Sequence, residues 1–447
     1  MSELGAKGVW DEEAVLREVK EKNIQVIRLW FADINGIIKG FAIPSGELEG
    51  AFSDGMGFDG SSIEGFARIH ESDLMAHPDP RTFAILPSNG EYGAARMFCD
   101  LKTPDRKPYE GDPRQVLKRA LDQAAQKGFK MFVGPELEYF YFRSSQSPEI
   151  LDEGGYFDAS INEIGTILRK QTIFALEKMG IPVEYSHHEV APSQHELDLR
   201  FCEALEMAER CLTYRFIVKE VARQGGYYAT FMPKPIFGVN GSGMHTHQSL
   251  FRGEQNSFYH PDAPYNLSSV ARHYLGGLLK YIREITVVLN QTVNSYKRLV
   301  PGYEAPVYIC WGQMNRSALV RVPRIRLGKE RSTRLELRSP DPACNPYLAF
   351  AVMLMAGLKG IEDKIEPPDP VEEDIYHLTP QERERLGIQT LPGSLWEAIE
   401  LAEKSTLVRE TLGEHVFSKF IDNKKIEWDQ YRMQVTDYEI KRYLPIW

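Results

Sequence analysis

The segment KMFVGPELEYFYF, residues 130–142, restricts the folds open to this chain more than any other. Side chains of a β-strand alternate between two faces. One face of this strand therefore carries Phe132, Gly134, Glu136, Glu138 and Phe140. Burying two neighbouring carboxylates costs free energy, because each loses its water and repels the other. The fold must compensate this negative charge.

The stretch HHEVAPSQHE, residues 187–196, predicts a strand, a turn and a second strand. Alternation places Glu189 on one face of the first strand, and Glu196 and Asp198 on one face of the second. The turn is predicted at 191–194, around a proline. A zinc protease would need two histidines at His-Glu-x-x-His spacing on a helix, which the proline excludes here.

Two further predicted strands carry ligand-type side chains. NGSGMHTHQSL aligns His245, His247 and Ser249 after glycines that allow close approach of the backbone to a ligand. RLELR aligns Arg334, Glu336 and Arg338, with leucines behind them. Taken alone, RLELR also fits an edge strand with alternating salt bridges.

The carboxylates of these strands would be unstable or protonated together unless cations lay among them. They are Glu136, Glu138, Glu189, Glu196 and Glu336. Oxygen ligands with one imidazole suit Mg²⁺ or Mn²⁺ rather than zinc. Arginines 316, 321, 324, 326, 331, 334 and 338 form a local basic segment. Alone, this segment fits a solvated surface with salt bridges. Beside divalent cations it indicates a phosphate-binding site. The sequence has no P-loop motif, so a P-loop enzyme is excluded.

Composition excludes several other classes of protein. The chain has 447 residues and a formal net charge of −10, which argues against a mainly nucleic-acid-binding surface. The amino terminus lacks a signal-peptide pattern, and no apolar run has the length of a membrane span. Five cysteines without a C-x-x-C pair fit reduced thiols, so a cytoplasmic location is expected.

The chain divides into two predicted units. Residues 11–23 predict a short helix and residues 24–34 a strand, typical of a small α+β unit. The segment 101–114, interrupted by proline and glycine, is the predicted linker, and a helical pattern with a glycine stop opens the larger unit. We place the domains at 1–108 and 109–447.

The carboxylates, histidines and arginines of the predicted strands, taken alone, indicate a metal-dependent phosphoryl-transfer enzyme.

These segments, in this order, strongly resemble type I glutamine synthetase over nearly the whole chain. The matching motifs are FDGSSIEGF, GPELEYF, HHEVAPSQHE, NGSGMHTHQSL, KRLVPGYEAP, NRSALVRVP and RLELRSPDPACNPYL. The resemblance implies ATP-dependent ligation of ammonia to L-glutamate through a γ-glutamyl phosphate. It also implies an α+β fold, with a small β-grasp-like amino-terminal domain and a larger catalytic domain whose antiparallel sheet carries the metals and is flanked by helices.

The resemblance assigns site residues motif by motif. One Mg²⁺ or Mn²⁺ ion would bind Glu138, Glu189 and Glu196, and the other would bind Glu136, His245 and Glu336. Glutamate would contact Asn240, Gly241, Arg298 and Arg338. ATP would contact Phe201, His247, Ser249, Arg321 and Arg334, with Arg316 and Arg321 facing its phosphates. Glu304 would lie on a flap that shields the acyl phosphate, and Asp59 would bind ammonium and remove a proton.

Assembly and regulation are implied as well. The resemblance implies a homo-dodecamer of two stacked hexameric rings, with each site shared between subunits, and it leaves room for regulatory protein partners. Arg68 resembles an arginine that senses glutamine in one subgroup, and Tyr376 lies in a context that predicts no adenylylation. Ser193 stands where the family often has glycine, which puts the local turn shape in question. His187, His188 and His195 are not assigned metals, and each is expected to be a hydrogen-bonded structural group.

Three alternatives remain open at this point. A ligase for another amine would share the fold, although Asp59 with Glu304 favours ammonia. A catalytically inactive structural or regulatory relative would have no reason to keep six costly metal ligands. A guanidino kinase would share arginines and a flap glutamate, but it would not explain two carboxylate clusters beside a histidine strand.

Overall fold

The computed structural model describes residues 10–65, 73–87, 93–159, 164–326, 328–373, 375 and 378–447. Arg68 and Tyr376, with their predicted regulatory behaviour, lie outside the described residues. Within these ranges, no helix combines the length and the apolar character needed to cross a membrane.

The amino-terminal part forms a six-stranded sheet with the order β2-β1-β6-β4-β3, and β5 pairs with β6. Its strands are β1 (Ile24–Ala32), β2 (Ile38–Pro44), β3 (Met56–Asp59), β4 (Asp73–Pro78), β5 (Ala84–Ile85) and β6 (Gly93–Lys102). Its helices are α1 (Glu12–Glu21) and α2 (Leu48–Asp54). β1 and β6 are parallel, and the other pairs are antiparallel. α1 begins where predicted, because the Asp11 side chain accepts a hydrogen bond from the Ala14 amide at 2.8 Å.

The rest of the chain is built on a ten-stranded, mostly antiparallel sheet with the order β14-β15-β16-β12-β7-β9-β8. These strands are β7 (Lys130–Phe142), β8 (Val183–His188), β9 (Gln194–Leu199), β12 (Met244–Arg252), β14 (Trp311–Gly312), β15 (Val320–Arg321) and β16 (Leu335–Leu337). Three short strands also belong to this sheet: β10 (Cys202–Glu203) and β11 (Tyr228–Thr230) pair with β7, and β13 (Gln255–Asn256) pairs with β12. The edge-strand interpretation of RLELR is wrong, because β16 lies between β15 and β12.

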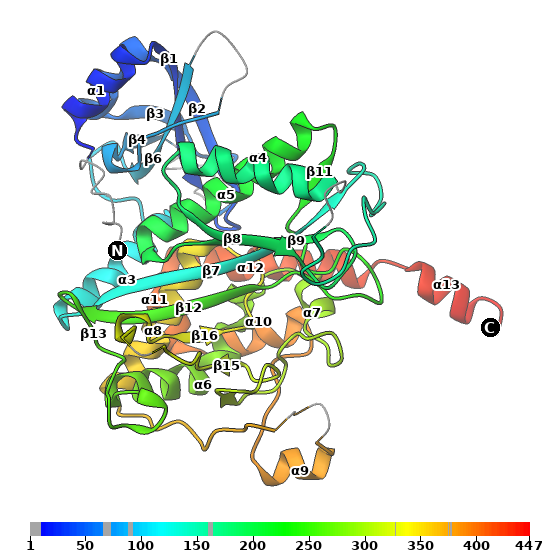
Figure 1. Cartoon of the computed structure of the whole chain (residues 1–447). Helices are drawn as coiled ribbons and strands as arrows, with labels where there is room; N and C mark the ends of the chain where they lie inside the picture. The colour runs from blue at the N-terminus through cyan, green and yellow to red at the C-terminus, as the bar shows by residue number, and fades with distance from the viewer. Residues whose placement is uncertain are drawn as a thin grey trace.

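Helices surround this larger sheet (Figure 1). They are α3 (Pro113–Gln126), α4 (Ile164–Lys178), α5 (Ala204–Gln224), α6 (Ser269–Leu289), α7 (Ser295–Arg298), α8 (Pro346–Glu362), α9 (Pro380–Arg385), α10 (Leu395–Glu403), α11 (Thr406–Leu412), α12 (Glu414–Arg432) and α13 (Asp437–Tyr443). Figure 1 shows the small sheet at one end of the molecule and α13 projecting from the body. The predicted α+β class is confirmed.

Alternation along the central strands separates the core from the site. Leu137, Leu197, Leu335 and Leu337 are fully buried and belong to the core cluster that α5, α6 and α8 share. The neighbouring positions on these strands hold glutamates, whose side chains point to the opposite face. The core therefore holds the strands that present the carboxylates.

A buried ion-pair network joins the two parts of the chain. Arg114 of α3 is 3% exposed, and its guanidinium contacts Asp79 at 2.7 Å, Glu209 of α5 at 2.8 Å, and Asp100 of β6. Burial opposes ionisation of Asp79, yet Arg81 and Arg114 lower its pKa to about 2. The predicted domain boundary at residues 108 and 109 lies between β6 and α3, and the division itself stays a prediction.

We predict that Arg114→Met destabilises the protein by about 3–5 kcal/mol, because it leaves buried carboxylates without their main cation. Chemical unfolding would measure the change in the free energy of unfolding. Arg17→Met is the control, since Arg17 is exposed and lies 3.7 Å from Glu13 on α1. Equal stability of the two variants would contradict the proposed importance of the network.

Candidate active site

Three neighbouring strands bring together the first predicted metal-ligand group. In the register of the sheet, His245 of β12 lies opposite Glu136 of β7, and His247 lies opposite Glu336 of β16. The His245 Nδ1 atom is 3.1 Å from Glu136 Oε2 and 3.9 Å from Glu336 Oε1. Glu136, His247 and Glu336 also offer ligand atoms within 4.8 Å of one another. The structure thus collects these residues in one place.

His247 is engaged through both ring nitrogens. The Arg334 Nε–H donates to His247 Nδ1 at 3.1 Å, and arginine has no acceptor atom. His247 Nδ1 is therefore the acceptor, and its Nε2–H donates to Glu136 Oε1 at 2.7 Å. His245 Nδ1 is left as the imidazole nitrogen that faces both carboxylates, and its place in the metal group stays a prediction.

The second predicted group lies at the β7–β9–β8 side of the sheet. Glu138 lies opposite Glu196 in the register of β7 and β9. His187 Nε2 lies 2.7 Å from Glu189 Oε1 and 4.0 Å from Glu196 Oε1. Glu138 Oε2 accepts hydrogen bonds from the Gly243 amide and the Gln194 side chain, both at 2.9 Å. These contacts hold Glu138 and Glu189 through amide and histidine groups, and the Arg298 guanidinium acts on Glu138 as a nearby positive charge.

The two predicted metal-ligand groups differ in the direction in which the pKa of their carboxyls is shifted. Burial and the nearby Glu189 raise the pKa of Glu138 to about 8. Burial and the neighbouring Asp198 hold the pKa of Glu196 well above its usual range. Burial also opposes ionisation of Glu136 and Glu336, but the pKa of both stays below the ordinary value, because His247 donates a hydrogen bond to Glu136 and the Arg338 and Arg321 guanidinium groups lie beside Glu336. Burial and repulsion between carboxylates therefore weigh most on Glu138 and Glu196.

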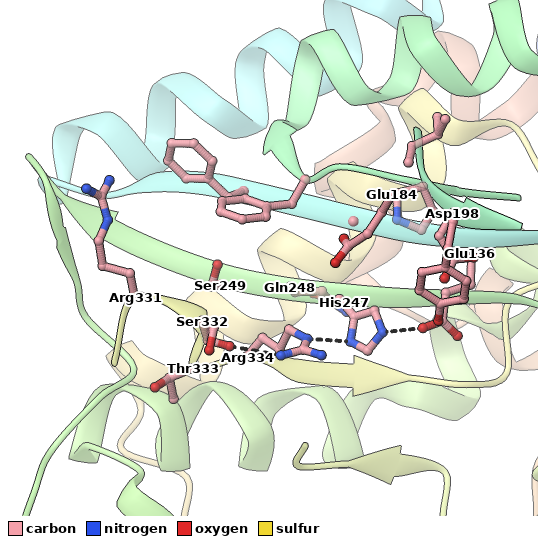
Figure 2. Close-up of a pocket in the computed structure, with 16 residues that line it drawn as sticks. Glu136, Glu184, Asp198, His247, Gln248, Ser249, Arg331, Ser332, Thr333 and Arg334 are labelled. Atoms are coloured by element: carbon pink, nitrogen blue, oxygen red, sulfur yellow. Dashed lines mark hydrogen bonds and ion pairs between the residues drawn. The ribbon is translucent and has the colours of Figure 1, made fainter. Parts of the chain in front are cut away.

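A pocket of about 210 Å³ lies along this face (Figure 2). Figure 2 shows Arg331 at one end and Glu136 at the other, with Ser249, Arg334 and His247 between them. Phe132 and Phe201 form part of the wall, and their ring centroids are 6.1 Å apart. The predicted ATP residues Phe201, His247, Ser249 and Arg334 therefore line one cavity. Arg321 lies outside this lining and forms an ion pair with Glu336.

The predicted glutamate residues lie beside the carboxylates. A Cβ atom at Gly241 would lie 2.3 Å from the Pro233 carbonyl oxygen, so only glycine fits there. The buried Arg298 guanidinium donates to the Ser339 carbonyl at 2.7 Å, and Arg338 Nε lies 3.2 Å from Glu336 Oε1. Asn240 donates to Glu304 Oε2 at 2.8 Å, which joins the glutamate loop to the flap segment.

Two predicted residues, Arg316 and Asp59, lie outside the lining of this pocket. Arg316 is exposed and interacts with the Tyr156 hydroxyl, close to Glu189. Asp59 is exposed at the end of β3, the edge strand of the small sheet, where its carboxylate accepts from the Ser61 amide at 2.8 Å. Figure 1 shows this sheet apart from the strands that carry the glutamates.

Comparison with known proteins identifies the family. The family model described as "Glutamine synthetase, catalytic domain" matches residues 110–443, and "Glutamine synthetase, beta-Grasp domain" matches residues 23–104. The chain belongs to the glutamine synthetase family. A glutamine synthetase of Methanosarcina mazei is 53% identical over 438 residues, covering 97% of each chain. One from Thermotoga maritima is 51% identical over 441 residues, covering 97% of this chain and 99% of the relative.

Solved structures agree with this glutamine synthetase assignment. A Plasmodium falciparum glutamine synthetase matches with a TM-score of 0.88 at 25% identity, covering 97% of this chain and 98% of the other. A structure described as a GmaS–ADP complex matches with a TM-score of 0.88 at 31% identity, covering 96% and 99%. The predicted β-grasp-like unit and the predicted activity are confirmed. The protein is a glutamate–ammonia ligase that forms glutamine from glutamate and ammonia with ATP, as its family does with divalent metal ions.

A third cluster of ligand-type residues braces the hairpin of this glutamine synthetase. Asp152, His188 and His195 lie within 4.8 Å of one another. Arg169 donates to His195 Nδ1, so His195 Nε2 carries the hydrogen and offers no lone pair to a metal. His188 faces the Glu189 carbonyl and Asp152 Oδ1, each at 2.6 Å, so both of its nitrogens donate. The cluster therefore acts as a hydrogen-bonded support.

Sequence reasoning missed Asp152 and the pocket-lining residue Arg331. Asp152 lies in a loop that is irregular in structure, so strand periodicity gives no signal for it. Arg331 is one of the seven arginines in the basic segment, and the sequence does not show that it differs from the other six in lining the pocket. Only the pairing of distant segments shows that both residues contact the site or its supports.

Ser193 adopts the left-handed conformation, with φ at 60°. Its hydroxyl oxygen accepts hydrogen bonds from the Leu151 amide at 2.6 Å and the Asp152 amide at 3.1 Å. A left-handed non-glycine residue costs about 1–2 kcal/mol, and these hydrogen bonds offset that cost. The serine thus makes contacts that a glycine at this position would lack.

We predict that Ser193→Ala lowers the free energy of unfolding by about 1–3 kcal/mol, because two amides lose their acceptor while the backbone strain remains. Ser193→Gly should cost less, since it relieves the strain. Chemical unfolding of both variants tests this order. Ser53→Ala, at an exposed serine on α2, is the control. A glycine variant less stable than the alanine variant would contradict the explanation.

Proposed function

We propose that glutamine forms in this chain at a site with two divalent cations. Glu138, Glu189 and Glu196 would hold one, and Glu136, His245 and Glu336 would hold the other. The observation that carries the proposal is the convergence of buried carboxylates in the sheet, with Glu138 opposite Glu196 and Glu136 opposite His245, where a cation would relieve the repulsion. Five carboxylates and one imidazole suit Mg²⁺ or Mn²⁺. When bound, these ions supply charge neutralisation to the transferring phosphoryl group.

The pocket along β7 and β12, with residues 331–334 on one side, is the proposed ATP site. Phe201 and Ser249 would contact the nucleoside, while His247 and Arg334 lie nearer the carboxylates. Arg316 and Arg321 would contact the phosphates, because guanidinium groups pair with phosphate oxygens. The γ-carboxylate of glutamate would attack the γ-phosphorus of ATP, the bond from that phosphorus to ADP would break, and γ-glutamyl phosphate would form.

Glutamate is proposed to lie beside Asn240 and Gly241, with Arg298 and Arg338 holding its carboxylates. Asp59 would accept a proton from ammonium, because only neutral ammonia has the lone pair that attacks the acyl carbon. The nitrogen would bond to that carbon, the bond from the carbon to the phosphate oxygen would break, and phosphate would leave with the second proton, which the new amide nitrogen gives up. Glu304 would shield the acyl phosphate from water, and its hydrogen bond with Asn240 supports this place beside the glutamate loop.

We predict that Glu336→Ala lowers the rate of phosphoryl transfer by more than about 100-fold, because it removes one ligand of the proposed cation. The rate of glutamate-dependent phosphate release and the Mn²⁺ affinity would both be measured. Glu366→Ala is the matched control, since Glu366 is exposed and pairs with Arg272. Unchanged Mn²⁺ affinity in Glu336→Ala would remove this residue from the metal site.

The proposal extends to the assembly, a homo-dodecamer of two hexameric rings with sites shared between subunits. Two observations support shared assembly. Asp59 lies on the small sheet, apart from the glutamates of the same chain. The projecting α13 and its following residues expose Tyr438, Leu444 and Trp447, the last at 96%. Large exposed apolar side chains in one segment are typical of an interface.

We predict that co-expressing Asp59→Ala and Glu336→Ala chains restores activity that neither variant shows alone. In a head-to-tail ring with random, equal mixing, about a quarter of the interfaces pair an intact small sheet with an intact catalytic part. Glutamine synthesis by the purified mixed oligomer measures this recovery. Normal assembly with only the summed activity of the two variants would contradict a shared site.

A cytoplasmic location is also proposed. All five cysteines are free in the structure, and Cys99, Cys211, Cys310 and Cys344 are buried. Free thiols are typical of reducing compartments.

We also propose the division into domains 1–108 and 109–447, which the two separate sheets support.

A further inference from the structure

The flap segment rests on the glutamate loop through two side-chain contacts. One is the hydrogen bond from Asn240 to Glu304. The other is formed by Lys234, whose Nζ atom lies 3.9 Å from the centroid of the Tyr303 ring. Glu304 has φ at 57°, a left-handed conformation that persists in a non-glycine residue only where surrounding contacts hold it. The flap conformation therefore depends on these contacts.

Lys234 is placed to act as the fixed partner. Its backbone amide donates to Asn294 Oδ1 at 2.7 Å, and its carbonyl accepts from Asn294 Nδ2 at 3.0 Å. The Ser242 amide donates to the Pro233 carbonyl at 2.8 Å, which closes the loop. Val239 packs against the cluster that contains Phe140. The loop is thus anchored to the sheet independently of the flap.

The Lys234 ammonium lies in a confined environment. The residue is 9% exposed, and its Nζ donates to the Val239 carbonyl on one side while the Tyr303 ring lies on the other. Burial and the nearby Arg298 guanidinium lower the pKa of Lys234. A partly desolvated ammonium gains more from an aromatic face than an exposed one does. The contact with Tyr303 therefore contributes substantially to holding the flap.

We infer that Lys234 is a positioning residue that keeps the flap closed through the Tyr303 ring while γ-glutamyl phosphate is present. The inference rests on the proposed function, which gives the flap its shielding role. With the flap open, a water oxygen attacks the acyl carbon and the bond from that carbon to the phosphate oxygen breaks. Phosphate then leaves, glutamate is regenerated with the water-derived oxygen, and ATP is consumed without forming glutamine.

The test measures phosphate released per glutamine formed by the intact enzyme at saturating ammonium. Lys234→Met and Tyr303→Leu should raise the excess phosphate about tenfold, as expected for the loss of a desolvated cation–π contact. Tyr303→Phe keeps the ring and should keep the parent ratio. Lys297→Met is the matched control, because Lys297 lies 5.1 Å from the Tyr431 ring in a second lysine–tyrosine contact. Tyr303 is half-buried, so Tyr303→Leu tests the contact without disturbing the buried lysine.

Glu304→Ala separates the inference from the function on which it rests. Leakage in Glu304→Ala, with parent ratios in both Lys234→Met and Tyr303→Leu, would overturn the role of Lys234 and leave the shielding proposal standing. A parent ratio in Glu304→Ala would overturn the shielding proposal itself, and the inference with it. Equal leakage in Tyr303→Phe and Tyr303→Leu would assign the effect to the hydroxyl group and overturn the ring contact.

Discussion

Repulsion among buried carboxylates is the constraint on which the rest of this structure depends. Glu136 and Glu138 of β7, Glu196 of β9 and Glu336 of β16 project from strands of one sheet, where water cannot screen them fully. The hydrogen bond from His247 compensates Glu136, and the Arg321 and Arg338 guanidinium groups compensate Glu336, so the pKa of both carboxyls lies below its ordinary value. Glu138 lacks enough such compensation, and its pKa rises to about 8. The chain thus holds part of its site in a state that bound cations would stabilise.

Such a site requires a rigid support, because the carboxylates would otherwise move apart. The antiparallel ladder fixes Glu138 opposite Glu196, and the leucines behind them are packed in the core. The hairpin between β8 and β9 has fewer ladder contacts near its tip. There Asp152 holds His188 and the Ser193 amide through hydrogen bonds. Rigid strands and a hydrogen-bonded turn therefore position the metal-ligand groups together.

The face that receives substrates is supported differently. The pocket is lined by residues of β7, β8, β9 and β12, by Phe201 and by the segment 331–334, whereas the glutamate loop and the flap are irregular segments held by side chains. Loops positioned on a rigid sheet are where proteins place groups that must admit and release substrates. Asn240 and Lys234 link the two loops at two points. Opening of the flap would break these contacts while leaving the sheet intact.

The sequence by itself determined which side chains share a strand face, because the two-residue period of a strand is a local property. The places of Glu136, His245 and Glu336 on ligand-bearing strands followed from it, and the family motifs supplied the activity. Glu189, predicted on the same strand as His187, lies one residue beyond the end of β8. Tertiary structure alone decided the register that places His245 opposite Glu136, and the central position of β16 between β12 and β15. It also decided the hydrogen positions on His195 and His247, since each depends on an arginine distant in sequence. Strand register and hydrogen-bond partners arise from contacts between remote segments, and no local pattern encodes them.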